Sequence, residues 1–173
     1  MLTFNSADEL VALGRDLAPL LSRGDVLILD GPLGAGKTTF ARGIGEGLSV
    51  RGPITSPTFV IARVHPALNG GPSLVHVDAY RLESLEDVDS LDLDASLDES
   101  VTVVEWGVGR VEQLADSYLL IRLGRPMPST LETGSQQLEV GEDEERSLHW
   151  LAIGPNWTSR IPGLAQVLGE SQN

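Results

Sequence analysis

Residues 31–38 of this 173-residue chain read GPLGAGKT and fit the spacing G-x-x-x-x-G-K-[ST]. A short apolar run precedes them and a helical pattern follows, which is the context that a phosphate-binding loop requires. Glycines let successive backbone N–H groups turn toward phosphate oxygens, and the N-terminus of the next helix adds its positive dipole. We expect Lys37 to bridge the β- and γ-phosphates of a nucleoside triphosphate and the Thr38 hydroxyl to bind Mg²⁺.

Lys37 is the only lysine in the chain, in which every other strongly basic side chain is an arginine. A compact ammonium fits between phosphates where the planar guanidinium group does not easily replace it. Ras-type GTPases recognise guanine with an Asn-Lys-x-Asp loop, which a chain without a second lysine cannot form. ATP is therefore the favoured nucleotide.

A phosphate loop also needs a carboxylate near Mg²⁺ and a group that senses the γ-phosphate. The stretch TSPTF contains Thr58 at the place where switch-type NTPases close a threonine over the metal, although it also reads as an ordinary proline turn. The stretch HVDAYRL places Asp78 at the end of a predicted strand, at the edge where ligands gather in open α/β sheets. An Asp there can also simply cap a turn, and we expect His76 to be structural.

The stretch VTVVEWG is an apolar strand that ends in Glu105, which is the Walker B pattern for an acid delivered to a metal. A buried glutamate is costly without a cation or a hydrogen-bond partner, so we favour Glu105 as the metal ligand. Trp106 could merely fill the core at the end of this strand.

The elements that must position these residues follow from the pattern of apolar side chains. Ser6 and Glu9 have capping-box spacing before a helix at 7–21, and a second helix is expected at 37–48. Strands are expected at 25–30, 59–64, 74–78, 101–105 and 119–123, with a hairpin turn at 65–73. Gln137–Val140 and Ser147–Ile153 are expected to pair as edge strands.

Strands that alternate with helices predict an α/β fold, and the hairpin and late strand pair make the sheet mixed but mainly parallel. We expect a three-layer sandwich of the P-loop NTPase type. Residues 1–154 would form one ATPase domain, and residues 155–173 a C-terminal tail with at most one short helix, at Pro162–Leu168.

The composition limits the classes of partner. The formal net charge of −13 argues against a protein that grips nucleic acid unaided, because such binding relies on lysine and arginine. There is no cysteine, no apolar run of transmembrane length and no signal-like N-terminus, so a soluble cytoplasmic domain is the expectation.

The order of motifs GPLGAGKTTFARG, SPTF, HVDAYRL and VVEWG closely resembles the TsaE family, over roughly Asn5 to Gly107. This resemblance implies an ATPase of bacterial threonylcarbamoyladenosine (t6A) biosynthesis that works with TsaD-type and TsaB-type partners. TsaD modifies adenosine 37 of tRNAs that read ANN codons. ATP hydrolysis on the TsaE subunit would support multiple turnover, and tRNA would be held only through the complex.

The resemblance also implies roles for individual residues. Lys37 would contact phosphates, Thr38 and Glu105 would hold Mg²⁺, and Asp78 would position water or the hydration shell of the metal. Thr58 would belong to a first switch and Trp106 to a second. The nucleotide pocket would further include Ser6, Gly34, Ala35, Gly36, Thr39 and a late arginine, for which we favour Arg146 over Arg125.

Two other functions remain open on the sequence. A small-molecule kinase also uses a phosphate loop, but it needs an arginine-bearing lid that excludes water, and no arginine-rich lid is evident. A nucleotide-dependent interaction switch would hydrolyse ATP slowly and act through binding. The acidic stretch Glu83–Glu99 is expected to be a solvated helix and turn, and it could face the partner proteins.

Overall fold

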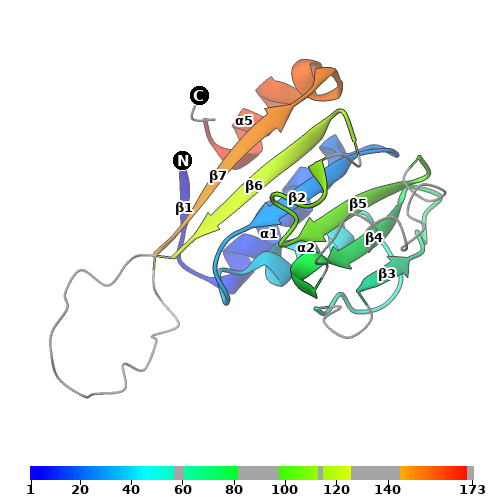
Figure 1. Cartoon of the computed structure of the whole chain (residues 1–173), viewed down its shortest axis with the longest axis horizontal. Helices are drawn as coiled ribbons and strands as arrows, with labels where there is room; N and C mark the ends of the chain where they lie inside the picture. The colour runs from blue at the N-terminus through cyan, green and yellow to red at the C-terminus, as the bar shows by residue number, and fades with distance from the viewer. Residues whose placement is uncertain (57–60, 82–97, 113–114, 126–144, 171–173) are drawn as a thin grey trace, which may run out of the picture.

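A seven-stranded mixed sheet forms the centre of the molecule in the computed structural model (Figure 1). The structure describes residues 1–56, 61–81, 98–112, 115–125 and 145–170. The strands are β1 (Leu2–Phe4), β2 (Val26–Asp30), β3 (Ala62–His65), β4 (Ser73–Asp78), β5 (Ser100–Glu105), β6 (Tyr118–Gly124) and β7 (Arg146–Ile153). The α-helices are α1 (Ala7–Leu17), α2 (Lys37–Gly47) and α5 (Ile161–Leu168), and the 3₁₀ turns are η1 (Ala18–Leu20), η2 (Ala79–Arg81) and η4 (Pro155–Arg160).

The strand order is β1-β7-β6-β2-β5-β4-β3. The four central strands β6, β2, β5 and β4 are parallel, whereas β3, β7 and β1 each join the sheet antiparallel to a neighbour. The carboxyl ends of β2, β4 and β5 therefore meet at one edge of the sheet. The expected mixed, mainly parallel α/β sheet is confirmed.

The larger hydrophobic core lies between one face of the sheet and the helices α1, α2 and α5 (Figure 1). Its fully buried side chains include Leu10 and Leu17 of α1, Phe40 and Ile44 of α2, and Leu27 of β2. A smaller core on the opposite face joins apolar strand residues to the segment around Val111 and Ala115. Of the three expected layers, the sheet and one helical layer lie within the described residues.

Several sequence predictions shift in extent. The first helix ends at Leu17 and continues as η1, because Pro19 lacks the N–H that an α-helix would use. The predicted hairpin is confirmed: β3 and β4 pair antiparallel, with Val64 opposite Val75. The strand expected at 59–64 appears as β3, which begins at Ala62 and ends at His65, one residue later than expected. Residues 59 and 60 lie outside the described part.

The late strands differ from the prediction. Ser147–Ile153 is confirmed within β7, but β7 is an inner strand, because β1 pairs with it on one side and β6 on the other. Gln137–Val140, its expected partner, lies outside the described residues, as does Glu83–Glu99 except for its last two positions. The short strand β1 was not predicted from the sequence.

The C-terminal segment packs against the rest of the molecule. The expected short helix is present as α5, one residue longer than predicted, and Leu164 and Leu168 are fully buried. The indole N–H of Trp150 donates to the Gly169 carbonyl (2.7 Å), and the Met1 ammonium donates to the Glu170 carbonyl (3.0 Å). The N-terminus therefore lies beside the end of the described chain (Figure 1).

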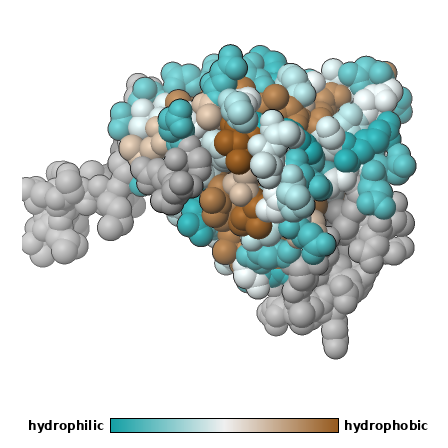
Figure 2. Space-filling model, turned by 90° about the horizontal axis from the view of Figure 1, so that it is seen from above, coloured by the Kyte–Doolittle hydropathy of each residue, from teal (hydrophilic) through white to brown (hydrophobic). Residues whose placement is uncertain are grey.

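Hydrophilic side chains cover much of the face shown in Figure 2. On the face shown in Figure 2, apolar side chains gather in a band among hydrophilic ones. Across the described ranges, no helix combines the length and the apolar character that crossing a bilayer demands.

Candidate functional site

A pocket of about 550 Å³ opens at the edge where β2, β4 and β5 end. The glycine-rich loop at residues 31–36 and the start of α2 line one side, with Gly34, Gly36, Lys37, Thr38 and Thr39. The ends of β4 and β5 line another, with Asp78, Glu105 and Trp106, and Arg146 of β7 lines the far end. Residues predicted from separate stretches of sequence are thus brought together in one cavity.

The backbone of the loop explains its glycines. Gly31 has φ +139° and lies so close to β6 that a Cβ would stand 2.2 Å from the Leu123 carbonyl oxygen. Gly36 is the N-cap of α2 and has a left-handed φ of +106°. Ala35 is fully buried in the core and is absent from the pocket lining, so its side chain supports the loop from beneath.

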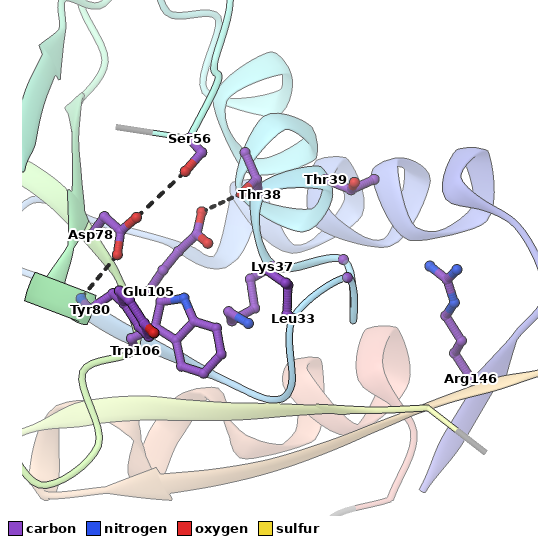
Figure 3. Close-up of a pocket in the computed structure, with 12 residues that line it drawn as sticks. Leu33, Lys37, Thr38, Thr39, Ser56, Asp78, Tyr80, Glu105, Trp106 and Arg146 are labelled. Atoms are coloured by element: carbon purple, nitrogen blue, oxygen red, sulfur yellow. Dashed lines mark hydrogen bonds between the residues drawn. The ribbon is translucent and has the colours of Figure 1, made fainter. Parts of the chain in front are cut away.

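Lys37 points back across the mouth of the loop (Figure 3). Its Nζ donates to the carbonyl oxygens of Gly31 (2.6 Å) and Pro32 (2.9 Å) and lies 3.6 Å from the centre of the Trp106 ring. Burial lowers the pKa of Lys37 from its ordinary 10.5, while the charges of Glu105, Asp30 and Asp78 oppose that shift. The ammonium therefore lies among carboxylates in a desolvated site.

Thr38 and Glu105 are in direct contact. The Thr38 hydroxyl donates to Glu105 Oε1 at 2.7 Å, so the first turn of α2 meets the end of β5 (Figure 3). His76 Nε2 lies 2.8 Å from the same carboxylate oxygen. Glu105 is only 3% exposed, and these two contacts supply the hydrogen bonds that its buried carboxylate needs.

Asp78 ends β4 directly opposite Glu105 in the parallel register. Its Oδ1 accepts a hydrogen bond from the Tyr80 backbone N–H (3.0 Å), and its Oδ2 lies 3.5 Å from the Ser56 hydroxyl (Figure 3). The carboxylate thus caps the turn that follows β4, as the alternative interpretation expected, and also faces the pocket.

Trp106 adopts a left-handed backbone conformation, with φ +62°. A side chain other than glycine is strained in this region, and such strain gathers at functional sites. The turn directs the indole into the pocket, over the Lys37 ammonium and at an edge-on angle to the Tyr80 ring, with 5.4 Å between ring centres. Trp106 is therefore part of the pocket wall and belongs to neither hydrophobic core.

The family scan matches residues 4–130 to the TsaE model, described as threonylcarbamoyl adenosine biosynthesis protein TsaE. The chain belongs to the TsaE family.

Curated TsaE proteins resemble the chain over most of its length. It is 53% identical to the TsaE protein of Streptomyces coelicolor over 85% of this chain and 93% of that protein. It is 34% identical to the TsaE protein of Bacillus subtilis over 96% of this chain and 91% of that one. Among solved structures, a crystal structure of Bacillus subtilis YdiB matches with a TM-score of 0.65 at 28% identity, over 96% of this chain and 91% of that one.

Of the other residues that the TsaE resemblance implies, some line the pocket and others do not. Thr58 lies outside the described residues. Ser6 caps α1 by accepting a hydrogen bond from the Glu9 N–H (3.1 Å), and it does not line the pocket. Arg146 lines the pocket at the end opposite Glu105 (Figure 3). Arg125 also reaches the loop, since its Nη1 would stand 3.4 Å from a Cβ at Gly34.

Three residues of the pocket wall were missed in the sequence: Leu33, Ser56 and Tyr80. Ser56 and Tyr80 belong to the quoted stretches TSPTF and HVDAYRL, so their nearness to Thr58 and Asp78 was the available signal. Leu33 is 83% exposed at the tip of the loop, where a polar residue would be the ordinary expectation. Only the three-dimensional pairing of loop and pocket identifies it.

The residues present fit a Mg²⁺–nucleotide complex. Among the described residues, no three His, Asp or Glu side chains form a metal-binding group by themselves. Mg²⁺ characteristically takes one or two protein oxygens and completes its shell with phosphates and water. Thr38 in the first turn of α2 and Glu105 at the end of β5 are in contact and offer oxygens that fit this pattern, and Asp78 lies beside Glu105 in the sheet.

Proposed function

We propose that this TsaE-family protein is a Mg²⁺-dependent ATPase that acts in t6A modification of tRNAs that read ANN codons. Its family places it in threonylcarbamoyl adenosine biosynthesis. The observation that carries the ATPase proposal is the 2.7 Å contact between Thr38, which follows the phosphate-loop lysine, and the buried carboxylate of Glu105. A glutamate at that place serves Mg²⁺ and not the core.

Each residue then has a role in hydrolysis. The phosphates are bound by Lys37, by the loop at Gly34 and Gly36, and by the N–H groups at the start of α2. Thr39 and Arg146 contact the periphery of the nucleotide. Thr38 and Glu105 hold Mg²⁺, which when bound neutralises the charge that develops on the phosphates. Asp78, which accepts a hydrogen bond from the Tyr80 N–H, would orient water or the hydration shell of the metal.

The partners are proposed to be TsaD-type and TsaB-type proteins, and tRNA is bound only through that complex. The net charge of −13 supports this arrangement, because an acidic chain repels a polyanion. We infer that hydrolysis is slow in isolation and responds to the partners.

The test is ATP hydrolysis with and without Mg²⁺, with and without the TsaD–TsaB pair, together with a screen of small-molecule phosphate acceptors. We expect hydrolysis that requires Mg²⁺ and changes when the partners are added. Hydrolysis that ignores the partners, combined with phosphorylation of a metabolite, would identify a small-molecule kinase. Nucleotide-controlled partner binding with no turnover would identify an interaction switch.

A further inference from the structure

One carboxylate oxygen joins three elements of the fold. Glu105 Oε1, at the end of β5, accepts from the Thr38 hydroxyl of α2 (2.7 Å) and lies 2.8 Å from His76 Nε2 of β4. The function proposed above gives a place to Thr38 and Glu105 but none to His76. The sequence alone suggested only a structural role for this histidine.

The register of the sheet places His76 beside Glu105. Asp78 stands opposite Glu105 in the parallel pairing of β4 with β5, and His76 precedes Asp78 by two residues. Because side chains alternate along a strand, His76, Asp78 and Glu105 project from the same face of the sheet. His76 reaches Glu105 from beneath the pocket, where it is fully buried (0% exposed).

The chemistry of the two groups decides which one donates in the contact between His76 Nε2 and Glu105 Oε1. An ionised carboxylate only accepts hydrogen bonds, so the proton of a neutral His76 lies on Nε2, which donates to Glu105. The other ring nitrogen, Nδ1, is buried with no partner in the described part of the chain. An unsatisfied buried nitrogen costs free energy that an apolar side chain would avoid, so the value of the imidazole lies in its bond to Glu105.

We propose that His76 is a positioning residue for the metal site, which holds the Glu105 carboxylate against Thr38 so that both can serve one Mg²⁺. The proposal rests on the Mg²⁺–nucleotide function given above. Groups that hydrogen-bond a metal ligand restrict its rotamers, and their loss commonly lowers metal affinity by about 10–100-fold. His76 itself does not contact the phosphates, because it lies behind Glu105 and does not line the pocket.

Two amide variants separate positioning from packing. In His76→Gln the side-chain N–H₂ is as many bonds from Cβ as Nε2 is, so it can still donate to Glu105. In His76→Asn the amide is one bond shorter and reaches only the place of Nδ1. Both replace the buried imidazole with a polar amide, but asparagine also leaves a larger cavity than glutamine does. The two roles are therefore separated by the Mg²⁺ requirement, which a loss of packing alone would not change.

The measurement is nucleotide affinity at increasing Mg²⁺ and in EDTA, with the full chain and non-hydrolysable ATP. We expect His76→Asn to need about tenfold or more Mg²⁺ for half-maximal tightening, with affinity in EDTA unchanged, and His76→Gln to remain close to wild type. His65→Asn is the matched control. His65 is a second buried histidine with an unpartnered Nε2, and it pairs with Leu74 at the other end of β4 from Asp78.

An equal Mg²⁺ requirement in wild type and His76→Asn would overturn the positioning role, as would equal impairment of the Asn and Gln variants. Thermal unfolding of each variant, recorded without nucleotide, identifies a general loss of folding. If wild type itself bound nucleotide with no response to Mg²⁺, the proposed metal-dependent function would fail, and the positioning role would fall with it. The two failures are therefore distinguishable.

Discussion

At the scale of single residues, Lys37 shows how the site combines opposing effects. Lys37 is 5% exposed, and this burial disfavours the charge of its ammonium. Two backbone carbonyls, an indole ring and nearby carboxylates favour the charge. Desolvation is the largest effect, and the pKa of Lys37 is lowered. Lys37, the proposed phosphate-binding lysine, can therefore lose its proton more readily than a surface lysine does.

This lowered pKa predicts a pH dependence of nucleotide binding. As the pH rises toward 10.5, the Lys37 of the free protein deprotonates earlier than an ordinary lysine, so affinity falls by up to about tenfold per pH unit above its pKa. The charge of the nucleotide stays nearly constant above pH 7, because a phosphate loses its last proton at about pH 6. Equilibrium binding without Mg²⁺, from pH 7 upward, checks this expectation.

The Lys37→Arg variant is the control, because a guanidinium stays charged throughout that range. Whatever its absolute affinity, we expect that affinity to change little with pH. A wild-type affinity that stays constant up to pH 10.5 would show that the protonation of Lys37 does not govern binding.

At the scale of elements, α1 and α2 pack so closely that α1 fixes the position of α2 and of the loop before it. A Cβ at Gly43 of α2 would stand 2.2 Å from the Val11 carbonyl oxygen of α1. Backbone atoms cannot move aside as the end of a flexible side chain can. Because Lys37 and Thr38 begin α2, this contact also sets where they stand relative to Glu105.

We therefore expect Gly43→Ala to lower the free energy of unfolding by about 1–2 kcal/mol through overpacking, despite the better helix propensity of alanine. Urea-induced unfolding measures this change. In the control, Gly163→Ala in α5, the new Cβ would meet only the flexible side chain of Leu20, at 3.1 Å. It should be neutral or stabilising by up to about 1 kcal/mol. Equal stabilities of the two variants would refute the close-packing argument.

The elements also show what the sequence can and cannot predict. The phosphate loop, α2 and the strands that end at Asp78 and Glu105 were predictable, because an apolar run followed by glycine or a charge is a local signal. The three residues of β1 carry no periodicity, and their pairing with β7 exists only in the folded chain. The bond from His76 to Glu105 depends on the strand order and register, which the sequence does not state.

At the scale of the whole molecule, the C-terminal segment is tied to the start of the sheet. Arg160 donates to both oxygens of the buried Asp25 carboxylate through its two terminal nitrogens, Nη1 and Nη2. Its Nη1 also donates to the Leu20 carbonyl (3.1 Å). The Ser22 N–H also donates to Asp25 (2.7 Å), and the Arg160 guanidinium stacks near the buried Trp157 ring. An ion pair between Asp25 and Arg160 thus joins the expected domain, residues 1–154, to the expected tail, residues 155–173.

Removing Arg160 would leave Asp25, which is 3% exposed, without its cation. We expect Arg160→Ala to lower the free energy of unfolding by about 3 kcal/mol. Arg15→Ala removes an exposed pair with Glu46 and should change it by less than about 1 kcal/mol. Chemical denaturation of both variants tests the comparison. A loss in Arg160→Ala no larger than in Arg15→Ala would mean that the segment contributes little to folding.

The proposed nucleotide site and the biosynthetic role of the family can be tested in one measurement. It is the amount of t6A formed on tRNA over many turnovers by TsaD-type and TsaB-type partners, supplied with wild type, Lys37→Ala or Glu105→Ala. We predict sustained modification with wild type and none beyond background with Lys37→Ala. Glu105→Ala should be strongly impaired and partly restored by excess Mg²⁺. Sustained modification with Lys37→Ala equal to that of wild type would contradict the account.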